Sequence, residues 1–219
     1  MKRVLLLAAM AASCARPPAP AAAPDVPLYG NLGSHHTQVT ASADAAKYFD
    51  QGMSLAYAFN HAEAVRSFKQ ALTLDPSCAM CAWGIAYALG PNINAPITPE
   101  AAAEAFKAIE QARAAAGRVT ERERAFLEAL ARRYAADPNA ARPPLDAAYA
   151  DAMRALVKQF PDDQGAQTLF VQSLMDTSPW SYWNQDGSPK PLTPEVLGAL
   201  EAVLTKNPQH IGAIHLYIH

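Results

Sequence analysis

No stretch of useful length alternates apolar and polar residues with a period of two, the pattern of a half-buried β-strand. The sequence also lacks a phosphate-binding glycine loop, a nucleotide-binding fingerprint and a nucleophile elbow. Basic residues cluster only as short pairs, so we expect no nucleic-acid-binding surface. These absences favour an all-α protein that is more readily a binding protein than an enzyme, and no catalytic residue is assigned.

The N-terminus predicts export. Two basic residues, Lys2 and Arg3, precede an apolar run, Val4–Met10, which is followed by small residues up to Cys14. The run is too short to span a bilayer as a mature helix. The residues that end at Cys14 resemble a bacterial lipoprotein processing site, in which the cysteine is acylated. The alternative is a soluble periplasmic protein cleaved after Ala12.

A linker follows the signal of residues 1–14. Alanine and proline dominate Arg16–Pro27, a composition typical of an extended tether, and residues 15–40 are interpreted as linker and loop. Removal of the signal would leave 16 basic and 20 acidic residues, a formal charge of −4. We expect a periplasmic or outer-membrane-anchored lipoprotein that touches the membrane only through a lipid at Cys14.

Residues 41–219 predict a series of helices, several of them ended by prolines. Asn60 is expected to cap the second helix, with Glu63 closing a capping box. The last helix is apolar and unfinished, so we expect an incomplete domain, the N-terminal fragment of a longer protein. The expected helices cover approximately residues 42–59, 61–74, 77–89, 101–116, 120–135, 145–160, 163–176, 193–206 and 210–219.

One segment carries the signature of a helical repeat. Gly52, Ala64, Phe68, Ala71 and Pro76 stand in the order Gly-x11-Ala-x3-Phe-x2-Ala-x4-Pro. This spacing describes two antiparallel helices that touch through small residues, with an aromatic ring in the groove and a proline at the end. The pattern resembles the tetratricopeptide repeat, which implies an α-solenoid of antiparallel helix pairs.

The resemblance extends over residues 37–219. Segments Phe59–Ala64, Asp75–Gly84, Gly90–Asn94 and His210–His219 are similar to a group of secreted bacterial tetratricopeptide-repeat proteins. The resemblance implies a helical superhelix in the cell envelope and no assigned activity. Repeat grooves bind proteins or peptides on rigid helix faces, so we expect a scaffold for such a partner in the envelope. The expected groove residues are Tyr48, Gln51, Leu55 and Tyr57.

The pair Cys78 and Cys81 stands where the third helix should begin. In an oxidising compartment a short disulfide is the favoured interpretation. A catalytic redox pair or half of a metal site are the alternatives. Haem attachment is disfavoured because Ala82 stands where a histidine should follow.

Three histidines form the strongest polar group. His215 and His219 are four residues apart and share one face of a helix, the spacing of paired zinc ligands, while His210 precedes that helix. No cofactor is expected under the scaffold hypothesis. The alternative hypothesis is an enzyme or metal-binding protein that holds zinc or another divalent metal in a histidine-containing pocket. The purely structural interpretation is that each ring is a half-buried, hydrogen-bonded side chain.

Two loops are unusual for a plain repeat protein. One holds Asn92 and Asn94, and the other concentrates Trp180, Tyr182 and Trp183 beside amides and an acid. Aromatic rings with short polar groups suit a pocket for a sugar, a peptide or a flat ligand. A loop that packs its own rings over the edge of the solenoid would have the same composition.

Overall fold

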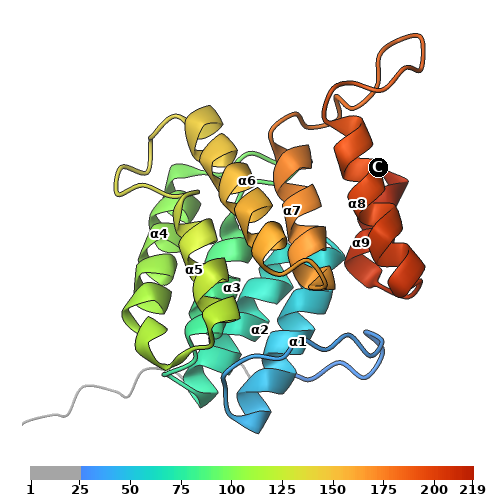
Figure 1. The fold of residues 1–219 in the computed structure, drawn as a ribbon. Helices are drawn as coiled ribbons and strands as arrows, with labels where there is room; N and C mark the ends of the chain where they lie inside the picture. The colour runs from blue at the N-terminus through green and yellow to red at the C-terminus, as the bar shows by residue number, and fades with distance from the viewer. Residues whose placement is uncertain (1–25) are drawn as a thin grey trace, which may run out of the picture.

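The computed structural model describes residues 26–219 as helices joined by loops, with two isolated β-bridges (Figure 1). The expected signal peptide, the lipid site at Cys14 and most of the tether lie outside the described residues. The helices are α1 (Ala43–Tyr57), α2 (His61–Leu74), α3 (Ala79–Leu89), α4 (Pro99–Ala114), the 3-10 turn η1 (Ala116–Arg118), α5 (Glu121–Ala131), α6 (Arg142–Gln159), α7 (Gln164–Asp176), α8 (Thr193–Lys206) and α9 (Ile211–Ile218).

Local chemistry sets the helix boundaries. Ser42 caps α1 by accepting a hydrogen bond from a backbone N–H of the first turn. Thr98 caps α4, with Pro99 in the first turn, where its missing N–H costs nothing. Thr120 and Glu123 form a reciprocal capping box at the start of α5. Most helices therefore begin within a few residues of the position predicted from the sequence.

Consecutive helices pack side by side (Figure 1). Helix α3 contacts α1, α2, α4 and α5 and is buried along almost its whole length. The ring of Phe68 in α2 lies between Gly52 of α1 and Gly84 of α3. A Cβ added at Gly52 would stand 2.5 Å from this ring, and one at Gly84 would stand 2.4 Å from it. The glycines are needed because the ring occupies the space of their absent side chains.

The odd-numbered helices form the inside of the molecule. α3 contacts both α1 and α5, and α9 contacts both α7 and α1. The last contact is close, because a Cβ added at Gly212 in α9 would stand 2.5 Å from the ring of Tyr57 in α1. Helices α1 and α9 therefore meet, and the helices of residues 26–219 form a closed array.

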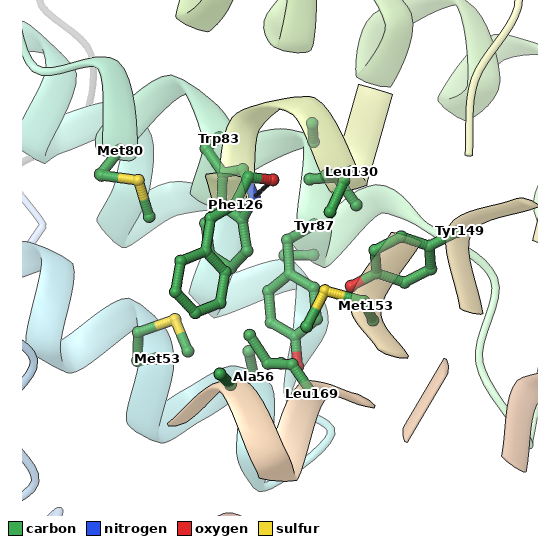
Figure 2. Packing of buried hydrophobic residues seen from close by; sticks show 14 of the residues in the cluster. Met53, Ala56, Met80, Trp83, Tyr87, Phe126, Leu130, Tyr149, Met153 and Leu169 are labelled. Atoms are coloured by element: carbon green, nitrogen blue, oxygen red, sulfur yellow. Dashed lines mark hydrogen bonds between the residues drawn. The ribbon is translucent and has the colours of Figure 1, made fainter. Parts of the chain in front are cut away.

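Side chains fill the inner face of the array (Figure 2). Trp83 stacks on Tyr87 and donates its indole N–H to the carbonyl of Phe126, at 3.1 Å. The residues labelled in Figure 2 come from five helices, α1, α3, α5, α6 and α7. Among residues 26–219 these side chains leave only a small hollow of about 20 Å³ at this position. The residues labelled in Figure 2 are Met53, Ala56, Met80, Trp83, Tyr87, Phe126, Leu130, Tyr149, Met153 and Leu169.

Across residues 26–219, every helix is either too short or too polar to cross a bilayer.

Candidate functional site

Three of the four expected groove residues are buried and the fourth is half-buried, so they do not line an open groove among residues 26–219. Gln51, Leu55 and Tyr57 are buried. The amide of Gln51 binds the backbone of Pro27 and the hydroxyl of Ser67. Tyr57 packs against α9, because the closed array brings that helix onto the face a solenoid would leave open. The fourth groove residue is Tyr48, whose hydroxyl donates to the carbonyl of Val26.

Phe59 ends α1 in an unusual backbone conformation. Its φ is 57°, in the left-handed region that glycine normally occupies. The Asn60 N–H donates to the carbonyl of Leu55 and the Phe59 N–H to that of Ala56, the two hydrogen bonds of a Schellman motif. Asn60 makes no side-chain cap to α2, so the expected capping box is absent. Its backbone serves the end of α1 instead, and Glu63 pairs with Arg66.

Aromatic side chains from three parts of the sequence converge on Phe59. Its ring centroid lies 4.3 Å from that of His215, 5.4 Å from that of His61 and 5.9 Å from that of His219. Trp180 makes an edge contact with His219, with ring centroids 5.0 Å apart. We call these five residues the Phe59 cluster. Among the described residues, only Phe59 and Trp180 are non-glycine residues with positive φ.

In this cluster the ring nitrogens of some histidines have hydrogen-bond partners and those of others have none. His215 Nδ1 binds the carbonyl oxygen of Tyr57, and its Nε2 lies 3.1 Å from Nε2 of His219. Neither ring nitrogen of His61 has a hydrogen-bond partner, although both are buried. Burial lowers the pKa of His61, with the charge of Arg133 as a second cause, and burial also lowers the pKa of His219, so the neutral form of each ring is favoured.

His210 lies at the other end of α9, apart from the His215–His219 pair. Its Nδ1 accepts the Ala213 N–H and so caps the helix. Its ring packs at 5.8 Å from that of His35, whose pKa burial lowers to about 4, with the neighbouring His210 as a second cause. Both line a polar cavity of about 670 Å³ beside the starts of α5, α7 and α9. The structure does not assemble the expected three-histidine site.

No group of three or more histidine, cysteine, aspartate or glutamate side chains within residues 26–219 is arranged to hold a metal ion. Cys78 and Cys81 form a disulfide at the start of α3, where Cys78 Sγ accepts the Cys81 N–H. In this state the two sulfurs are neither metal ligands nor free thiols.

A buried ion network joins the carboxyl ends of three inner helices. Arg133, which follows α5, donates to the Asp176 carboxylate at 2.8 Å and to the Pro91 carbonyl at 3.0 Å. It also donates to Asp146, which Arg142 contacts at 2.7 Å. The side chains of Arg133 and Asp176 are 1% and 2% exposed, so this pair is almost fully removed from water.

This network borders a cavity of about 300 Å³, which we call the Asp176 cavity. Asp176 Oδ1 and Arg142 Nε are buried and have no hydrogen-bond partner. Burial raises the pKa of Asp176 to about 6, against the opposing attraction of Arg133. At pH 7 the carboxylate is therefore mostly ionised and has one free acceptor. The cavity is lined by Pro91–Ile97, Arg142, Asp146, Asp176 and Pro179.

The two unusual loops meet at this end of the molecule. Asn92 and Asn94 line the Asp176 cavity, and the Asn92 side chain accepts two backbone N–H groups of its own turn. Pro179 lines the same cavity and is followed by Trp180, which contacts the Phe59 cluster and is 60% exposed. The cavity and the cluster are therefore neighbours.

The other aromatic residues of the second loop have different surroundings. Tyr182 is buried and donates its hydroxyl to the Met175 carbonyl, which anchors the loop to α7. Trp183 is half exposed and lines a shallow hollow of about 160 Å³ with residues of α8 and α9. Tyr182 thus has a packing role, whereas Trp180 belongs to the site.

Sequence reasoning missed Arg133, Asp146 and Asp176. Their only local signal is a charged residue at a position where the helical period calls for an apolar one. That signal does not reveal which charges pair across 43 positions of sequence.

No family model, no curated protein and no solved structure matches the chain.

Proposed function

We propose that the protein binds peptides by their amino-terminal end, and that the Asp176 cavity is the binding site. The proposal keeps the peptide-binding role expected of a helical-repeat protein and moves it from the filled inner face to the carboxyl ends of the inner helices. The observation that carries it is the buried Asp176 carboxylate, which lines a cavity and has one oxygen bound by Arg133 and the other without a hydrogen-bond partner.

The chemistry of the cavity suits the first residue of a peptide. A free amino terminus is a cation with several N–H donors, and Asp176 Oδ1 is a buried anionic acceptor for it. The unpartnered Nε–H of Arg142 is a donor for the first peptide carbonyl. Pro91, Arg133 and Asp176 stand at or just beyond the carboxyl ends of helices, where the helix dipole favours a cation.

The walls of the cavity set the size and character of the ligand. A volume of about 300 Å³ is at the lower end of the range for small-ligand sites, so it holds the peptide terminus and not a folded domain. Ile93, Ile97 and Pro179 give it an apolar part for a side chain. The exposed ring of Trp180 stands next to Pro179, where the following peptide residues would leave the cavity.

A titration with trialanine and its N-acetyl derivative tests the proposal. We expect trialanine to bind, and acetylation or Asp176→Asn to weaken binding at least about tenfold, because each removes a charge-assisted hydrogen bond. The matched control is Asp162→Asn, since that side chain is 91% exposed and lies outside the cavity. Circular dichroism verifies that each variant is folded. Equal binding of the acetylated peptide, or no calorimetric binding of trialanine, would refute the proposal.

A further inference from the structure

The ring of His215 is held in one orientation and one tautomer. Its Nδ1 binds the carbonyl oxygen of Tyr57 at the end of α1. A carbonyl oxygen only accepts hydrogen bonds, so Nδ1 carries the hydrogen and Nε2 keeps its lone pair. A ring nitrogen fixed by a backbone carbonyl, with the other nitrogen free, is the usual arrangement of a metal-ligating histidine.

The second nitrogen is already in place. His219 follows one helical turn later, and its Nε2 lies 3.1 Å from Nε2 of His215. Two imidazole nitrogens bound to one ion at about 2.0–2.1 Å stand roughly 3.0–3.4 Å apart when the angle between them is about 90–110°. The observed distance falls in this range without any movement of the backbone.

The surroundings favour a small cation over an anion. Tyr57 is the last residue of α1, and its carbonyl oxygen contacts His215, so the carbonyl end of α1 faces the pair. Trp180 covers one edge of His219, and Phe59 lies against both imidazoles. These rings give the pair an apolar border on two sides, and the unpartnered nitrogens of His61 belong to the same cluster.

We propose that the His215–His219 pair binds a divalent transition-metal ion of the kind that prefers imidazole, Cu²⁺ or Zn²⁺, with water in the remaining positions. His210 is not a ligand, since it caps α9 and packs on His35. Without metal, His219 Nε2–H donates to His215 Nε2. The ion takes the place of this hydrogen, and the proton of neutral His219 moves to its Nδ1.

Titration of the tag-free full chain with Cu²⁺ at pH 7, followed by electron paramagnetic resonance, tests the proposal. We expect one equivalent of Cu²⁺ with hyperfine coupling to two imidazole nitrogens, and weaker binding of Zn²⁺ at the same pair, in line with the general order of affinities. His219→Ala should lower the affinity at least about tenfold and remove one nitrogen coupling. His219 is the safer ligand to replace because only His215 holds the bond to Tyr57.

His36→Ala is the matched control. His36 is 69% exposed and pairs with Asp50, away from the pair, so this variant should keep both the affinity and the two-nitrogen spectrum. Circular dichroism confirms the helical content of each variant. Copper binding that is equally strong in His219→Ala, or that is lost in His36→Ala, or a wild-type spectrum without two nitrogen couplings would overturn the proposal. Peptide binding at Asp176 is independent of these outcomes.

Discussion

At the scale of single residues, Phe59 occupies a backbone position that suits glycine. The left-handed conformation costs a residue with a Cβ roughly 1–2 kcal/mol, and the structure tolerates it where the ring packs among three imidazoles. Strained residues of this kind are common at functional sites. The free-energy cost of the backbone conformation at Phe59 is thus offset where its ring packs against the surrounding histidines.

Substitution at Phe59 separates the backbone cost from the packing of the ring. Phe59→Gly and Phe59→Ala both remove the ring, but only glycine relieves the strained φ, so we expect the glycine variant to be more stable by about 1 kcal/mol. At Lys107, an exposed position inside α4, the same two substitutions should have the opposite order. Urea denaturation measures all four free energies of unfolding. If Phe59→Ala were as stable as Phe59→Gly, the backbone at position 59 would not be strained.

Asp176 gives peptide binding a defined pH dependence. Burial raises the pKa of its carboxyl to about 6, so the ionised form that accepts an ammonium group is lost as the pH falls through that value. We expect the affinity for trialanine to decrease between pH 7 and pH 5. Calorimetric titration at several pH values measures it. An affinity that is constant over this window would show that ionised Asp176 is not the acceptor.

At the scale of helices, two glycines have opposite predicted effects. Gly212→Ala places a Cβ 2.5 Å from the buried ring of Tyr57, so α9 must move from α1 and the protein should lose about 1–3 kcal/mol. Gly198 lies inside α8 with no atom within 4 Å of an added Cβ. Gly198→Ala should therefore stabilise by about 0.5–1 kcal/mol. Urea denaturation gives both values, and a change of the same sign in both would show that the contact of α9 with α1 does not matter.

At the scale of the whole molecule, buried neutral histidines make stability depend on pH. Burial lowers the pKa of His35, His61, His210 and His219 below the unfolded value of 6.5. The unfolded chain then binds more protons, so stability falls as the pH drops from about 6.5 toward 4. Asp176 acts in the opposite sense, because its raised pKa favours the protonated native state below pH 6.

Four buried histidines destabilise the fold as the pH falls, whereas only Asp176 stabilises it. We therefore expect a lower urea midpoint at pH 5 than at pH 7. His35→Gln should make the decrease smaller, because it removes the histidine whose pKa falls to about 4. An unchanged or higher midpoint at pH 5 would mean that the buried rings are not held neutral.

The sequence was a good guide to local structure and a poor one to the site. Prolines and caps such as Thr98 and Thr120 act within one turn, so the helices could be predicted from their neighbours. The burial of Tyr57 could not be predicted, because Gly212 meets its ring from 155 positions away and no local pattern shows that contact. The pair of His215 and His219 could be predicted because both lie on one helix.

The contact between α1 and α9 also limits how this architecture can grow. An open solenoid accepts an extra helix pair anywhere, because each pair touches only its neighbours. Here an inserted pair would push Gly212 away from Tyr57 and separate the two walls of the Phe59 cluster. The number of helix pairs between these two residues is therefore fixed by geometry, and duplication or deletion within this part of the chain would abolish the cluster.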